Sequence, residues 1–139
     1  MNVMDIFETM DYGPAPEAAA PGLTWIEERS PFGLFINNRW VKPASGKYID
    51  SVNPGNGKPL AKVAAANAKD VDRAVAAARG AFETWGKTPG HVRARYMYAI
   101  ARHIQKHSRL LAVLESLDNG KPIRETRDID IPLVARHFY

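Results

Sequence analysis

The stretch from 110 to 122 reads Leu110-Leu-Ala-Val-Leu-Glu-Ser-Leu-Asp-Asn-Gly-Lys-Pro122, and it sets the expected fold of the chain. Its leucines repeat at helical spacing and predict one apolar stripe, formed by Leu110, Leu111, Leu114 and Leu117. Asp118-Asn119-Gly120 ends this helix, because glycine adopts the left-handed backbone conformation without a Cβ clash. Pro122 then suits the first turn of a new helix. The sequence thus predicts a buried helix with a sharp end.

The composition is that of an ordinary soluble globular domain. The chain has 139 residues, of which 45% are hydrophobic and 24% are charged, and this length is enough for one domain. It has no cysteine, which excludes disulfides, thiolate metal sites and a cysteine nucleophile within these residues. No apolar run approaches the roughly 20 residues that span a bilayer. Asp5 and Glu8 lie in the first ten residues without a basic flank, which argues against a secretory signal, so we expect a cytoplasmic protein.

Charge is unevenly distributed along the chain. The net charge is +4, yet residues 1–29 carry six acidic residues and one basic residue. Between Glu83 and Glu115 there are six basic side chains and no acidic one: Lys87, Arg93, Arg95, Arg102, Lys106 and Arg109. These residues scatter around the expected helices, which favours a solvated surface over a nucleic-acid site. His103 and His107 have the i, i+4 spacing of zinc helices, but no third ligand is evident, which favours the same solvated surface.

The first third of the chain is expected to contain a linker and short strands. Residues 1–12 carry a short apolar pattern, and residues 13–22 are rich in proline and alanine, so we expect little regular structure there. Thr24 is predicted to cap a helical turn through Glu28. Asn37-Asn38 lies between two β-prone runs in residues 34–41 and indicates a hairpin. Residues 48–52 and 60–64 read as further strands, which suggests a small β-meander.

Amphipathic helices are predicted to follow the meander. Asn67 is a plausible N-cap, with Asp70 in the first turn of a helix that continues to Trp85 and ends at Gly86. We expect Thr88 to cap the next helix and Ser108 to cap the leucine helix. We also expect Pro122 to open a further helical segment and Pro132 to break it, with Asp130 capping a last helical turn. The apolar pattern still runs at Tyr139, so we expect that the chain is cut there.

Five motifs in order resemble the aldehyde dehydrogenase superfamily over roughly residues 34–139. The first is Phe35-Ile-Asn-Asn-Arg-Trp40, which is similar to the first hairpin of the family. The others are Val52-Asn-Pro54 with Gly57, Asp70 to Val75 with Phe82 and Trp85, Arg93 to Ile104, and Leu117 to Pro122. Asp5-Ile-Phe-Glu8 with Met10 and Tyr12-Gly-Pro14 resembles the N-terminal extension of the family-16 type, so residues 1–33 are expected to be an N-terminal extension and linker.

The resemblance implies an α/β parent protein with a Rossmann-type cofactor domain. Enzymes of this family oxidise aldehydes to acids with NAD or NADP, through a cysteine nucleophile, hydride transfer and a glutamate that activates water. Neither a cysteine nor a Gly-rich phosphate turn occurs here. Residues 34–139 would form the N-terminal part of the cofactor-binding domain, incomplete at its C-terminal end, with a structural role and no cofactor of its own. Its implied partners are the rest of the same polypeptide, the aldehyde substrate and a homo-oligomer, with no nucleic acid and no membrane.

The resemblance also implies one ion site. Many family members hold a monovalent cation near this region with backbone carbonyls and the aspartate of Leu-Asp-Asn-Gly, which here would be Ser51, Val52 and Asp118. A hard cation suits such oxygen ligands. The alternative is that Asp118 is a helix-end residue that accepts backbone N–H groups, as aspartate often does.

A second hypothesis is a free-standing, basic helical adaptor that binds a protein or nucleic acid. Packing separates the two hypotheses. A dehydrogenase portion would leave the apolar faces of Val71, Val75 and Phe82, and of Leu110, Leu114 and Leu117, partly uncovered. An adaptor would bury both faces within its own residues.

Overall fold

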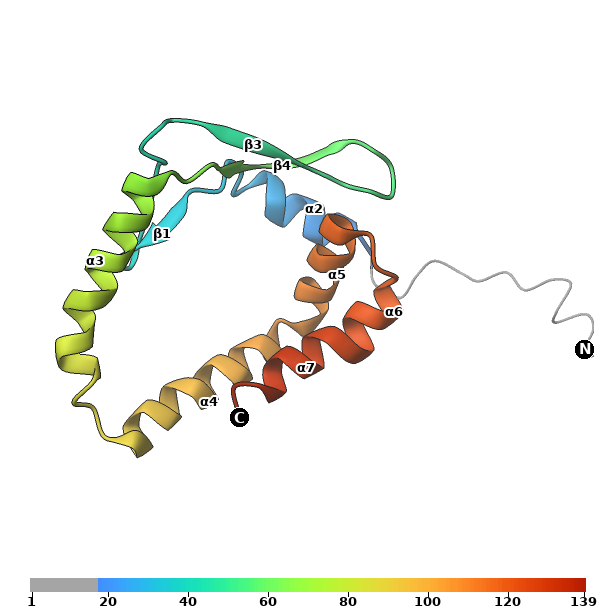
Figure 1. Cartoon of the computed structure of the whole chain (residues 1–139). Helices are drawn as coiled ribbons and strands as arrows, with labels where there is room; N and C mark the ends of the chain where they lie inside the picture. The colour runs from blue at the N-terminus through green and yellow to red at the C-terminus, as the bar shows by residue number, and fades with distance from the viewer. Residues whose placement is uncertain (1–17) are drawn as a thin grey trace, which may run out of the picture.

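The computed structural model describes residues 18–139 as short strands and helices around an open frame (Figure 1). Helices α3 and α5 lie on opposite sides of this frame. α4 joins them along one edge, and the strands with α2 lie along the other. The elements in chain order are α2 (Ala20–Glu27), β1 (Leu34–Ile36), β2 (Arg39–Val41), β3 (Tyr48–Val52), β4 (Pro59–Ala64), α3 (Ala68–Trp85), α4 (Gly90–Lys106), α5 (Ser108–Asn119), α6 (Ile123–Glu125), a π-helical turn (Thr126–Asp130) and α7 (Ile131–Arg136). The apolar pattern of residues 1–12 lies outside the described residues.

The predicted hairpin at Asn37-Asn38 is confirmed. β1 and β2 pair antiparallel, with Phe35 opposite Trp40. Asn37 and Asn38 have φ values of 50° and 59°. A type I′ hairpin turn requires positive φ at both central residues, and asparagine tolerates it. The rings of Phe35 and Trp40 pack with centroids 5.2 Å apart.

The second pair of strands forms a sheet of its own. β3 and β4 pair antiparallel, and the register shifts between Ser51 and Val52. Short strands followed by helices were expected, but the strands form two separate two-stranded sheets instead of one continuous meander. A single parallel bridge from Phe32 to Val63 connects the segment before β1 to β4.

The prediction of little regular structure in residues 13–22 is wrong for residues 20–22. Helix α2 begins at Ala20 and has a proline in its first turn, where the missing N–H costs nothing. Gly22 is buried against α5, and a Cβ at this position would lie 2.8 Å from Cγ1 of Val113. Thr24 does not cap the helix, because it lies inside it and Ala19 holds the N-cap position. Packing on α5 therefore orders a segment whose composition resembles a linker.

The long helices follow the predicted pattern with small corrections at their starts. Asn67 is the N-cap of α3 as predicted, and together with Asp70 it forms a reciprocal capping box. Thr88 does not cap α4, because its hydroxyl donates to the Thr84 carbonyl at 3.2 Å and Pro89 holds the N-cap position. Ser108 does not cap α5, because it is the first residue of the helix and His107 holds the N-cap position.

The leucine helix ends as predicted, but the following segment is continuous. Gly120 has φ +78°, the left-handed conformation expected after α5. The predicted break at Pro132 is wrong, because the π-helical turn carries the chain directly into α7. Pro132 lies in the first turn of α7, where its missing N–H does not break a regular helical bond.

The core lies where α2, α4, α5 and α7 meet. Ala101 and Ala112 are fully buried there, and Val113, Ile131 and Ala135 are nearly so. The leucines of α5 are half-buried around this centre. By contrast, the apolar face of α3 is open: Val71, Val75 and Phe82 are 55%, 47% and 71% exposed.

Candidate functional site

The structure brings Ser51 and Asp118 together across 67 positions of sequence. The Ser51 hydroxyl on β3 donates to Oδ1 of Asp118 at the end of α5, with an oxygen–oxygen distance of 2.5 Å. The Asp118 side chain is exposed to solvent. A hydrogen bond to an ionised acceptor is stronger than a neutral one, so this contact ties the β3–β4 sheet to α5.

Backbone geometry around this pair explains its position. The register of the β3–β4 sheet shifts between Ser51 and Val52, and such a bulge leaves a backbone group unpaired. The turn after β3 packs on the end of α5, because a Cβ on Gly120 would lie 2.7 Å from Cγ of Pro54. Only glycine therefore fits at position 120, for reasons of both space and backbone conformation.

A shallow groove of about 290 Å³ runs beside the Ser51–Asp118 pair. Its walls are mostly apolar and come from α2, β4 and α5, with Trp25, Phe32, Leu60 and Leu114 among the lining residues. Ser51, Glu115 and Asp118 supply polar side chains to its lining. Among residues 18–139, no group of three histidine, cysteine, aspartate or glutamate side chains is placed to hold a metal ion.

An ion pair links the residue after Gly120 to the π-helical turn. The Lys121 ammonium donates to Oδ2 of Asp130, and this hydrogen bond raises the pKa of Lys121 above its ordinary value of 10.5. Nearby, the Arg127 guanidinium donates to the Asp128 carboxylate at 2.6 Å and lowers the pKa of Asp128 below 3.8. These two contacts therefore favour the charged forms of Lys121 and Asp128 around α6 and the π-helical turn.

A hydrogen bond between two hydroxyls holds α5 against the π-helical turn. Thr126 is fully buried, and its Oγ1 lies 2.9 Å from Oγ of Ser116. The same threonine hydroxyl donates to the Ile123 carbonyl at 3.1 Å. This contact fixes the start of the last helical segment on α5.

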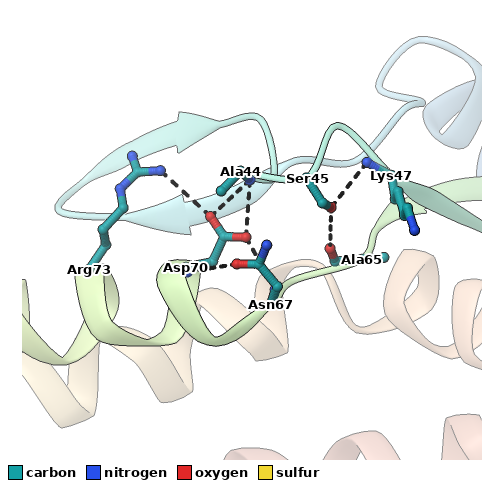
Figure 2. Close-up of polar contacts among 7 residues, drawn as sticks. All are labelled: Ala44, Ser45, Lys47, Ala65, Asn67, Asp70 and Arg73. Atoms are coloured by element: carbon teal, nitrogen blue, oxygen red, sulfur yellow. Dashed lines mark hydrogen bonds and ion pairs between the residues drawn. The ribbon is translucent and has the colours of Figure 1, made fainter.

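A second polar cluster at Asp70 was only partly predicted (Figure 2). Both carboxylate oxygens of Asp70 accept the Ala44 N–H at 3.0 Å, and Oδ2 accepts the Asn67 N–H at 3.2 Å. The Arg73 guanidinium lies 3.6 Å from Oδ1, and Asp70 is 1% exposed. The capping role was visible in the sequence, but the contact to Ala44 depends on the fold of the loop between β2 and β3.

The histidines and basic residues remain on the surface. The rings of His103 and His107 pack edge to face with centroids 4.6 Å apart, at the junction of α4 and α5. All six basic residues between Glu83 and Glu115 are exposed. None of the helices within residues 18–139 combines the length and the apolar character that a membrane span requires.

Comparison with known proteins identifies the family. A sequence model described as the aldehyde dehydrogenase family matches residues 40–139. The chain therefore belongs to the aldehyde dehydrogenase family, and the α/β fold class expected from the sequence is confirmed.

Several solved structures are similar to this chain. PnpE from Pseudomonas sp. WBC-3 is 42% identical, with a TM-score of 0.75 over 77% of this chain. HpcC from Thermus thermophilus is 33% identical, with a TM-score of 0.81 over 86%. Betaine aldehyde dehydrogenase from Staphylococcus aureus, solved in complex with NAD+, is 30% identical, with a TM-score of 0.81 over 86%. The matched part is 22%, 23% and 24% of these three chains, so this chain spans under a quarter of their length.

Proposed function

We propose that residues 34–139 are the N-terminal part of the cofactor-binding domain of an aldehyde dehydrogenase. The complete enzyme would oxidise aldehydes to carboxylic acids with NAD or NADP, in the cytoplasm and as a homo-oligomer. Residues 1–33 would be an N-terminal extension and linker of the family-16 type. The 139 residues have no cysteine to act as the family nucleophile, so their own role would be structural.

The uncovered face of α3 supports this structural role. Among the described residues, α3 contacts mainly β1, and its side chains at Val71, Val75 and Phe82 are largely exposed. A free-standing adaptor would bury these side chains, since full burial is worth roughly 1.5–3 kcal/mol for each. The α3 face is therefore free to pack against the parts of the aldehyde dehydrogenase fold that lie outside this chain.

An activity assay tests the proposal. We expect that the purified chain produces no aldehyde-dependent reduction of NAD or NADP, because it has no cysteine to attack an aldehyde. Measurable turnover with a simple aldehyde would contradict the structural role.

A self-association assay tests the uncovered face directly. Exposed apolar patches promote association, so Phe82→Ser should lower the sedimentation-average mass of concentrated protein. Glu83→Ser is the matched control, because Glu83 is also exposed on α3 but is polar. Equal masses for wild type and Phe82→Ser would show that the face does not drive association.

We also propose that Ser51, Val52 and Asp118 contribute to a monovalent cation site. The hydrogen bond between Ser51 and Asp118 supports this assignment, because it holds the Asp118 carboxylate beside the strand segment whose backbone carbonyls the family would use, and a carboxylate oxygen suits a hard cation. Remaining ligands would come from water or from the rest of the polypeptide.

Thermal unfolding in different salts tests the cation site. At equal ionic strength, the unfolding midpoint should be higher in potassium or sodium chloride than in tetramethylammonium chloride. Asp118→Asn should abolish this difference, and the control Asp128→Asn should preserve it. Equal midpoints for the wild-type chain in all three salts would refute the site.

A further inference from the structure

The chain contains two Asn-Gly pairs, and both form the same local turn. At the first, Oδ1 of Asn56 accepts the Lys58 N–H at 3.0 Å. At the second, Oδ1 of Asn119 accepts the Lys121 N–H at 2.8 Å. Such an Asx turn folds the side-chain carbonyl back over the peptide bond that follows the asparagine. In each pair, the next backbone nitrogen belongs to a glycine, which has no Cβ to obstruct an approach to that nitrogen.

We propose that Asn56 is a site of spontaneous deamidation, and that the fold makes it react faster than Asn119. The Gly57 backbone nitrogen gives its proton to hydroxide and attacks Cγ of Asn56. A C–N bond forms, the Cγ–Nδ2 bond breaks, and ammonia leaves with a proton taken from water. Water then opens the resulting cyclic imide at one of its two carbonyls and yields aspartate or isoaspartate. Water is the only co-reactant, and no electron is transferred to or from the protein.

The turn at Asn56 favours both the approach and the charge of this reaction. Holding the nucleophile beside the electrophile removes much of the entropic cost of ring closure. The Lys58 N–H already donates to the oxygen that becomes negatively charged during the attack, as in an oxyanion hole. The Gly57 N–H donates to the Asn53 carbonyl at 2.8 Å, and the Gly120 N–H donates to the Ser116 carbonyl at 3.0 Å, so a backbone hydrogen bond must open before attack at either site. At Gly57 this bond belongs to an exposed turn in which a Cβ would meet no atom within 4 Å, whereas at Gly120 it belongs to the packed end of α5.

The surroundings of Asn119 oppose the same reaction. Its Nδ2 donates to Oε1 of Glu115 at 3.4 Å, and Asp118 precedes it in the chain. These carboxylates repel hydroxide and the anionic intermediate. Asn119 is also the last residue of α5, and Gly120 is packed against Pro54, so ring closure requires movement of a packed helix end. We therefore expect deamidation to be about tenfold slower at Asn119 than at Asn56.

Peptide mapping by mass spectrometry measures both rates in the intact 139-residue chain. The protein is incubated at mildly alkaline pH and sampled over time, and fragment spectra assign each deamidation to a residue. Asn53 serves as an internal control in the same tryptic peptide, because the residue after it is Pro54 and the backbone nitrogen of proline carries no proton. The expected result is accumulation of aspartate and isoaspartate at Asn56, slower accumulation at Asn119 and none at Asn53.

Variants separate the contributions of the local charge and the fold. Lys58→Glu should slow deamidation at Asn56 about threefold, because it places a negative charge beside the reacting amide. Lys47→Glu, at another exposed lysine, should leave the rate unchanged. In urea, the difference between Asn56 and Asn119 should shrink. Equal or reversed rates in the folded chain, or a ratio that urea leaves unchanged, would overturn the proposal.

Discussion

Helices α3 and α5 have similar sequence patterns but lie in opposite environments. Both carry apolar residues at helical spacing, and both end at a glycine. α3 has a complete capping box and an open apolar face. α5 has no side-chain N-cap, yet it packs against α2, α4, the π-helical turn and α7. In α3 the observed order comes mainly from local signals, and in α5 it comes mainly from tertiary packing.

The test with the largest expected effect replaces a small side chain by a larger one in each helix. Ala112 on α5 is fully buried, so Ala112→Leu should lower the free energy of unfolding by about 1–3 kcal/mol through overpacking. Ala76→Leu on the exposed surface of α3 should change it by less than about 0.5 kcal/mol. Urea denaturation of both variants measures the difference. Equal effects would mean that α3 is packed as tightly as α5.

The second test removes the local signal that starts α3. Asp70→Ala leaves the N–H groups of Ala44 and Asn67 without their carboxylate acceptor, which should cost about 1–3 kcal/mol of unfolding free energy. Hydrogen exchange at the Ala44 amide should accelerate in parallel. Asp72→Ala is the control, because this nearby carboxylate is exposed. If the two variants were equally stable, the Asp70 cluster would not hold the loop on α3.

The third test cuts the contact between the β3–β4 sheet and α5. Ser51→Ala removes the hydroxyl that donates to Asp118, and we expect a loss of about 1 kcal/mol because the bond is exposed. Ser45→Ala is the comparison, and we expect a smaller loss there because the Ser45 hydroxyl makes only two longer bonds, to the Ala65 carbonyl at 3.4 Å and from the Lys47 N–H at 3.2 Å. A larger loss for Ser45→Ala than for Ser51→Ala would show that the Asp118 contact is dispensable.

The smallest expected effect concerns the Lys121–Asp130 ion pair and depends on pH. The pKa of Lys121 is raised in the folded chain, so the pair stabilises the fold fully below pH 10.5 and loses its effect as pH rises through the folded-state pKa. The difference in unfolding midpoint between wild type and Lys121→Met should therefore shrink above pH 10.5. A difference that grows with pH would contradict the assigned sign.

Sequence reasoning succeeded where a few neighbouring residues determine the backbone. Asn37-Asn38 predicted a hairpin, Asn67 with Asp70 predicted a capped helix, and Gly120 predicted a left-handed helix end. In each case the decisive interactions lie within four residues of one another. Such local signals are complete in the sequence itself.

Sequence reasoning failed where distant contacts decide the conformation. Residues 20–22 resemble a linker, but the close approach of Gly22 to Val113 makes them the start of a helix. The contact of Asp70 with Ala44 spans 26 positions, and no spacing pattern indicates it. Ser51 and Asp118 were grouped only through the family resemblance, and no spacing pattern indicates the hydrogen bond between them.

The π-helical turn at Thr126–Asp130 also limits how this part of the chain can change in length. The Ile131 N–H bonds to the Thr126 carbonyl five residues back, so the turn accommodates one residue more than a regular helix would. Each residue of an α-helix rotates the chain by about 100°. Deleting a single residue there would therefore restore ordinary winding while Ile131 and Ala135 still face the core, whereas a deletion within α7 would rotate every later residue by about 100°. The widened turn is thus the one stretch between Thr126 and Arg136 that can lose a residue without reorienting α7.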